Sequence, residues 1–307
     1  MKKIANRIRS LTNRFIKRTV WYDNLWDGAL KIINLNTFGL QVVNTGSGSG
    51  VHNFCYDGLP IKGFNFALGP QSLVHDFNIL KNYFSYFEKG CTIFIPICPF
   101  SGMVVKYDKA HNFKYYPMLH PATIDNFDET ERNLAYKTLN DPLGTLSLAC
   151  IKGILRADIL HRFKSVIHKT HKPSIKQSAD EMMRGWLKQF SIGDLKDSIS
   201  DVHGQDLKKR KVVLGEMLDF CTERGFRPIV VIPPMHPLLS EQFPRTFETQ
   251  YMDPMKEEAN LRGVLCIDYM RDNRFFNDSL YETALFLNKE GAKLFTRQIL
   301  SDVKIIL

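Results

Sequence analysis

The segment Gly39-Leu-Gln-Val-Val-Asn-Thr-Gly-Ser-Gly-Ser-Gly50 joins a short apolar run to a glycine-rich turn. The apolar run predicts a β-strand over 39–45, and the three glycines that follow predict a tight turn at its carboxyl end. Open parallel sheets bind ligands at such turns, because glycine lets backbone N–H groups approach a phosphate or an oxyanion closely. This segment therefore predicts both the type of sheet and the place of a site.

Apolar runs of strand length alternate with helix-length segments along much of the chain. Strands are expected at 39–45, 62–68, 91–97, 228–233 and 264–269. Helices are expected at 70–88, 206–224, 249–261 and 289–303. Asn288 is placed to cap the last of these helices. The spacing leaves room for crossover helices, so the expected class is α/β, with a mostly parallel sheet covered on both faces.

Two regions fall outside this alternation, residues 1–37 and residues 100–205. We expect residues 1–37 to form a basic amphipathic segment and a short lead-in, and residues 38–307 to form the α/β domain. One helical face of the first segment carries apolar residues at positions 4, 8, 11 and 15. Residues 100–205 have no strand pattern, and we expect a largely helical insertion there.

The positive charge of the chain is concentrated in two patches. The formal charge is +9, but residues 1–18 hold seven basic side chains and no acid, and residues 152–176 hold seven against Asp158. The rest of the chain has a formal charge of −4. A general nucleic-acid coat is therefore not expected, whereas residues 1–18 suit an anionic membrane surface. A helix packed on its own domain, or a basic tail for a partner, is the alternative.

The sequence also bears on location. Six scattered cysteines form no Cys-x-x-Cys pair, and the first residues lack the apolar stretch of a secretory signal. These features predict a cytoplasmic protein, peripheral on the inner face of the membrane if residues 1–18 bind lipid. No metal or cofactor is expected.

Three familiar glycine motifs do not fit the turn. A dinucleotide fingerprint would need glycine where Val51 stands, and a phosphate-binding P-loop would need Gly-Lys-Ser/Thr. A nucleophile elbow would need serine where Gly48 stands. The structural alternative is a tight turn whose serines cap a helix.

Four blocks of sequence point to one family. They are Val43-Asn-Thr-Gly-Ser-Gly-Ser-Gly50, Gly63-Phe-Asn-Phe-Ala-Leu-Gly-Pro-Gln-Ser-Leu73, Gly90-Cys-Thr-Ile-Phe-Ile-Pro-Ile97 and Phe286-Leu-Asn-Lys-Glu-Gly-Ala-Lys-Leu-Phe-Thr296. In this order the chain resembles the SGNH/GDSL hydrolases, in the branch met in bacterial capsular and surface-polysaccharide gene clusters. The resemblance implies a flavodoxin-like three-layer sandwich and serine-based acyl chemistry. It does not extend over residues 100–205.

The resemblance also implies site residues, and the triad positions are altered. The nucleophile position aligns with Gly48, the base position with Phe286 and the orienting acid with Thr283. The oxyanion or substrate-binding positions that it implies are Gly46, Gly48, Asn65 and Gly69.

Substitute catalytic groups exist in the sequence. Ser47 and Ser49 flank the nucleophile position, and His236 follows another strand, where it can act as a relocated base. His52, just after the turn, is a second histidine in reach of it.

Three functions remain open at this point. The first is a degenerate, glycan-binding member of the family in bacterial surface polysaccharide biosynthesis. The second is an O-acetyltransferase or esterase that uses Ser47 or Ser49 with an unconventional base. The third is a peripheral membrane protein. The expected partners are a glycan or lipid-linked polysaccharide precursor and an anionic membrane, with no nucleic acid.

Overall fold

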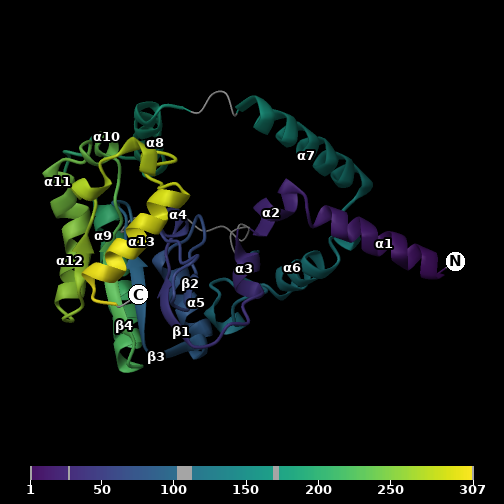
Figure 1. The fold of residues 1–307 in the computed structure, drawn as a ribbon, viewed down its shortest axis with the longest axis horizontal. Helices are drawn as coiled ribbons and strands as arrows, with labels where there is room; N and C mark the ends of the chain where they lie inside the picture. Colours follow the sequence, from purple (N-terminus) through teal and green to yellow (C-terminus); the bar gives the residue numbers. More distant parts are fainter. Residues whose placement is uncertain (1, 27, 102–112, 169–172, 306–307) are drawn as a thin grey trace. The chain divides into compact units, whose positions relative to one another are not determined.

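The structure is a computed structural model that describes residues 2–26, 28–101, 113–168 and 173–305 (Figure 1). The chain divides into two compact units. Residues 37–106 and 173–307 form the α/β unit, and residues 1–36 and 107–172 form the N-terminal unit. Each unit is described by itself.

The α/β unit is built on a five-stranded sheet. Its strands are β1 Leu40–Asn44, β2 Gly63–Asn65, β3 Phe87–Pro96, β4 Arg227–Ile232 and β5 Cys266–Asp268. Every neighbouring pair is parallel, and the strand order is β2-β1-β3-β4-β5. This order is that of doubly wound sheets of the flavodoxin type, whose switch point lies between β1 and β3.

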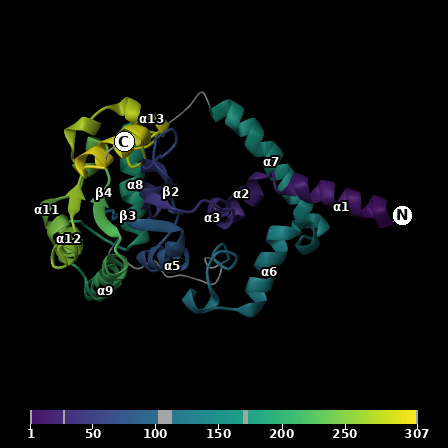
Figure 2. The ribbon, with the colours of Figure 1, turned by 60° about the horizontal axis from the view of Figure 1, so that its bottom comes forward.

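Helices cover both faces of the sheet. The unit contains α4 Gly48–Asn53, α5 Leu73–Tyr83, α8 Ile175–Gln189, α9 Asp201–Glu223, α10 Pro237–Ser240, α11 Arg245–Phe247, α12 Asp253–Asn260 and α13 Lys289–Asp302. Helix α9 packs on α5, α12 and β4, and α4 packs on α13. Figure 2 shows α9 and α12 on the side of the sheet opposite to α13.

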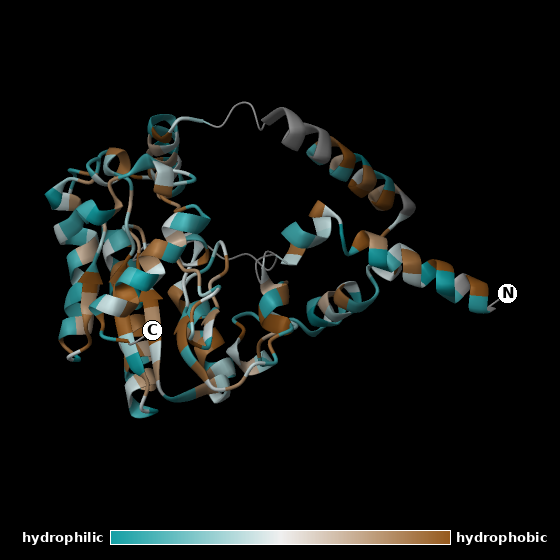
Figure 3. Ribbon diagram, in the orientation of Figure 1, coloured by the Kyte–Doolittle hydropathy of each residue, from teal (hydrophilic) through white to brown (hydrophobic). Residues whose placement is uncertain are grey.

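Side chains on both faces of the sheet are buried. Val42, Phe94 and Ile229 belong to a cluster with Phe295 and Ile299 of α13. Their neighbours Val43, Ile93 and Val230 are fully buried as well, so the inner parts of β1, β3 and β4 are apolar on both faces. Figure 3 shows the hydrophobic colour along most of these strands. A doubly covered parallel sheet requires this composition.

The N-terminal unit is helical. It contains α1 Lys2–Ile16, α2 Val20–Trp26, α3 Ala29–Ile33, α6 Glu129–Asn140 and α7 Leu148–His168, with single 3₁₀ turns at Pro121–Thr123 and Pro142–Thr145. The buried carboxyl group of Asp158 accepts a hydrogen bond from the Val20 N–H at 2.9 Å. This contact links the start of α2 to a helix more than a hundred residues away. No helix in the described ranges is both long and apolar enough to cross a bilayer.

The structure confirms the α/β class, the parallel sheet and the five strands. Asn288 caps α13, because its side chain accepts hydrogen bonds from the N–H groups of Glu290 and Gly291. The expected insertion at 100–205 is divided between the units: residues 107–172 group with the N-terminus, and α8 belongs to the α/β unit. The reason lies in α8, where Trp186 and Phe190 pack on Phe100 with ring centroids 4.9 and 5.0 Å away. Residues 102–112 and 169–172 of that segment lie outside the described ranges.

Candidate functional site

The candidate site is the turn that follows β1. It lies at the carboxyl end of the sheet, beside β3, where the strand order reverses. Gly46 adopts a φ of +113°, and a Cβ atom there would lie 3.3 Å from Pro96 at the end of β3. Only glycine combines that backbone conformation with so close an approach to the neighbouring strand. The structure of the turn therefore explains why position 46 is glycine.

The buried carboxyl group of Asp76 holds this turn in place through hydrogen bonds. Asp76 of α5 accepts hydrogen bonds from the Gly46 N–H at 2.7 Å and from the side-chain amide of Gln71. Gln71 also donates to the Gly46 carbonyl at 3.2 Å. Burial raises the pKa of Asp76 to about 7, although these hydrogen bonds and the nearby Arg210 lower it. The Gly46 N–H is thus already hydrogen-bonded to Asp76.

Two asparagines fix the other end of the turn. Asn44 donates to the side-chain oxygen of Asn65 at 3.0 Å and to the Gly50 carbonyl at 3.2 Å. Asn65 donates to the carbonyls of Gly50 and Phe54 and accepts from the Ala67 N–H at 2.9 Å. The Asn65 amide therefore holds the end of β2 against α4, and its polar atoms are occupied within the fold.

The second glycine faces an aromatic ring. A Cβ atom on Gly48 would lie 2.9 Å from the ring of Phe286, which comes from the turn before α13. The imidazole of His52 stacks on this ring, with centroids 4.4 Å apart and planes at 20°. Partial burial of the imidazole lowers the pKa of His52 below its usual value, although Glu282 raises it. Gly69 also approaches, since its Cβ position is 4.0 Å from the Cα of Gly48.

Thr283 organises the segment that carries Phe286. Its hydroxyl accepts hydrogen bonds from the N–H groups of Phe286 at 3.1 Å and Leu285 at 3.4 Å. The backbone N–H groups of Glu282 and Thr283 donate to the Phe286 carbonyl. A tight turn thus presents the phenyl ring to Gly48, and Thr283 has a structural role in it.

The two serines have different surroundings. Ser47 is half-buried at the start of α4, and its hydroxyl accepts a hydrogen bond from the Gln71 N–H at 3.2 Å. It does not cap α4 with its side chain. Ser49 is buried, with 5% of its surface exposed, and its hydroxyl has no hydrogen bond to any described residue. Neither serine is coupled to a base in the described ranges.

His236 is engaged elsewhere. Its Nδ1 accepts a hydrogen bond from the Leu238 N–H at 3.2 Å, as the cap of α10. The proton is therefore on Nε2, which donates to the Asp278 carboxylate at 2.9 Å. Within the described part of the chain neither ring nitrogen bonds Ser47 or Ser49, so the imidazole has no free lone pair aimed at a serine.

Sequence reasoning did not single out Asp76 or Asp278. A signal for Asp76 existed, because it stands three residues after Leu73 and three before Ile79, both buried on α5. A carboxyl group on the apolar side of a helix marks a buried, hydrogen-bonded group. Asp278 carried no such signal, since its pairing with His236 joins residues 42 positions apart.

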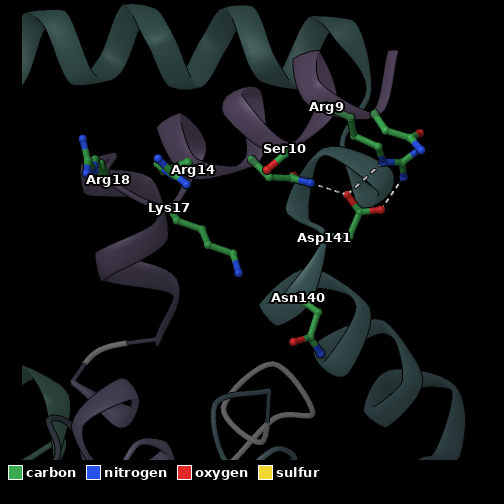
Figure 4. A pocket seen from close by; sticks show the side chains of 9 residues that line it. Arg9, Ser10, Arg14, Lys17, Arg18, Asn140 and Asp141 are labelled. Atoms are coloured by element: carbon green, nitrogen blue, oxygen red, sulfur yellow. Dashed lines mark hydrogen bonds and ion pairs between the residues drawn. The ribbon is translucent and has the colours of Figure 1, made fainter. Parts of the chain in front are cut away.

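A second hollow lies in the N-terminal unit. A cavity of about 590 Å³ opens on the polar side of α1 and is lined by Asn6, Arg9, Ser10, Asn13, Arg14, Lys17, Arg18, Asn140 and Asp141 (Figure 4). Arg9 forms an ion pair with Asp141 at its edge and holds the pKa of that carboxyl group below its usual range. The other cations make the cavity electropositive.

The fold and the site define a doubly wound α/β protein with a glycine-rich turn at its switch point. No family model matches the chain, and no curated protein sequence is significantly similar to it.

The contact between Gly48 and Phe286 predicts a measurable coupling. In the wild type a methyl group at position 48 displaces the phenyl ring, whereas Phe286→Ala leaves room for it. Gly48→Ala is therefore expected to be less favourable in the wild type than in the Phe286→Ala background, by about 1 kcal/mol. Urea unfolding of the four proteins measures this difference.

Gly185→Ala is the matched control, because nothing lies within 4 Å of its Cβ position in α8. It should change stability equally in both backgrounds. If Gly48→Ala is also additive with Phe286→Ala, the packing described for the turn is wrong.

The buried Asp76 predicts a pH dependence of stability. Its pKa rises from 3.8 to about 7 on folding, so the folded state binds the proton more tightly. The contribution is complete below about pH 4 and is lost as the pH rises to about 7, by at most about 4 kcal/mol at about 1.4 kcal/mol per pKa unit. Asp76→Asn keeps the accepting oxygen and cannot ionise. We expect it to flatten this loss, measured by urea unfolding at a series of pH values.

Glu241→Gln, at an exposed carboxyl group of the same unit, should leave the wild-type profile unchanged. Parallel profiles for the wild type and Asp76→Asn would rule out a raised pKa at Asp76.

Proposed function

We propose that the chain is a non-hydrolytic relative of the SGNH/GDSL hydrolases that binds a glycan at the turn after β1. On this proposal it acts in bacterial surface polysaccharide biosynthesis, on the cytoplasmic side of the membrane. Support comes from the order of the four sequence blocks, the 2-1-3-4-5 sheet and the position of the turn at its switch point.

The observation that carries the proposal is the contact of Phe286 with Gly48. The resemblance assigns Phe286 to the base position and Gly48 to the nucleophile position. A Cβ atom on Gly48 would lie 2.9 Å from the Phe286 ring, so the two residues are in contact. Neither carries a reactive group. On this proposal the two positions correspond to those of a catalytic pair, and neither residue can carry out acyl chemistry.

The remaining groups do not supply that chemistry. A serine hydroxyl is a weak nucleophile until a base takes its proton. Ser47 accepts a hydrogen bond from a backbone N–H, and His236 has both nitrogens occupied by Leu238 and Asp278. Ester hydrolysis through either serine is therefore disfavoured, and binding is the function that the turn supports.

The aromatic stack explains why a sugar is the proposed ligand. His52 and Phe286 form a stacked pair of nearly parallel rings next to Gly48, and the preceding residue Ser47 carries a half-buried hydroxyl. Pyranose rings have an apolar C–H face and a polar edge, which match a flat aromatic surface flanked by a few polar groups. The proposed contact is a sugar face on the Phe286 and His52 rings.

A microarray of bacterial capsular and O-antigen glycans tests this proposal with fluorescently labelled protein. Binding to one group of glycans is expected, and Phe286→Ala should weaken it about tenfold or more, because an aromatic contact is lost. Phe276→Ala, at a ring 47% exposed in the same unit, is the control and should bind normally.

Equal binding by the wild type and Phe286→Ala would place the glycan elsewhere. Absence of binding across the array would contradict the proposed function.

A further inference from the structure

The first helix leaves its apolar face uncovered. The exposed fractions are 67% for Ile4, 60% for Ile8, 55% for Leu11 and 51% for Phe15. Their spacing of four, three and four residues places them in one row along α1, on a helix of 15 residues. Such a row in a surface helix normally faces the core of its own domain. Here it faces outward.

The helix is attached through its opposite side. Arg9 and Asn13 both bond the Asp141 carboxylate, and the Asn13 side-chain oxygen accepts from the Leu143 N–H at 2.8 Å. Ile16, at the end of the helix, is 2% exposed. Figure 4 shows the Arg9 side chain directed to Asp141. Polar contacts thus hold α1 in the orientation that turns its apolar row away from its own unit.

A row of cations borders the apolar row. Arg7 stands three residues after Ile4 and four before Leu11, and Arg14 stands three after Leu11, so both lie beside that row on the helix surface. Lys3 extends the same line toward the N-terminus. Residues 1–18 contain no acid, and within the described ranges Arg7 and Arg14 form no ion pair. Arg7 is thus available to an anionic surface, and so is Arg14, which lies at the border between the apolar row and the cavity on the polar side of α1.

We propose that α1 lies in the interface of a bilayer that contains anionic lipids, with Ile4, Ile8, Leu11 and Phe15 among the acyl chains. Lys3, Arg7 and Arg14 then lie at the level of the lipid phosphates. A single helix about 22 Å long, apolar on one side and cationic beside it, has the composition of interfacial helices. A protein groove would also accept an apolar row, but the unpaired cations beside it favour a uniformly anionic surface.

This binding goes beyond glycan recognition and uses different residues. It provides a means of holding the protein at the membrane, where lipid-linked precursors are located. Failure of one proposal therefore leaves the other standing, because Phe286 variants test the first and α1 variants test the second.

Flotation of the full chain with vesicles tests the membrane proposal. The protein should float with vesicles of phosphatidylglycerol and phosphatidylcholine, and much less with phosphatidylcholine alone. Leu11→Gln/Phe15→Gln should abolish flotation, and Arg7→Gln/Arg14→Gln should weaken binding about fivefold for each cation removed. Val212→Gln, at an apolar residue of α9 that is 59% exposed, is the control and should float like the wild type.

Three results would overturn the membrane proposal. The first is equal flotation of the wild type and Leu11→Gln/Phe15→Gln, with folding checked by circular dichroism. The second is equal binding to both vesicle types. The third is no flotation, together with a wild-type dimer in sedimentation that Leu11→Gln/Phe15→Gln converts to monomer, which would make the row an interface between copies. The same α1 variants should keep wild-type glycan binding.

Discussion

The carboxyl group of Asp76 holds the turn at the end of β1 by accepting the Gly46 N–H at 2.7 Å. Other features of the site depend on this bond. With Gly46 fixed against Pro96, α4 begins at Gly48, close to Gly69 and beneath the ring of Phe286. Placing an ionisable group in the interior has a free-energy cost, visible as the raised pKa of Asp76. Its hydrogen bonds to Gly46 and Gln71 offset part of that cost.

Much of the fold was predictable from local patterns, whereas the site depended on distant contacts. The strands follow from short apolar runs, since a sheet covered on both faces needs both sets of alternating residues to be apolar. The division of residues 100–205 between two units was not predictable, because it rests on Phe100 meeting Trp186 and Phe190. The sequence blocks aligned Gly48 and Phe286 with the nucleophile and base positions of the family that the chain resembles. Only packing shows His52 stacked on Phe286 and His236 paired with Asp278.

The two units differ in the kind of surface that each one presents. The α/β unit carries an aromatic surface beside a glycine turn, whose Gly46 N–H and Asn65 amide are hydrogen-bonded within the fold. The N-terminal unit carries an exposed apolar row and unpaired cations on one helix. The positive charge of the chain thus follows from local surfaces, so nucleic acid is not needed to explain it. The two proposals, a glycan at one surface and a membrane at the other, are compatible with each other because they use different residues.

The central claim is that no serine of the turn acts as a nucleophile. Labelling of the full chain with a fluorophosphonate, read by intact mass, tests it most directly, because such reagents form adducts with activated serines. The wild type should stay unlabelled at pH 7 and should not hydrolyse p-nitrophenyl acetate above the buffer rate. A single adduct, together with turnover, that disappears in Ser47→Ala or Ser49→Ala would contradict the claim and show that the site is an active hydrolase.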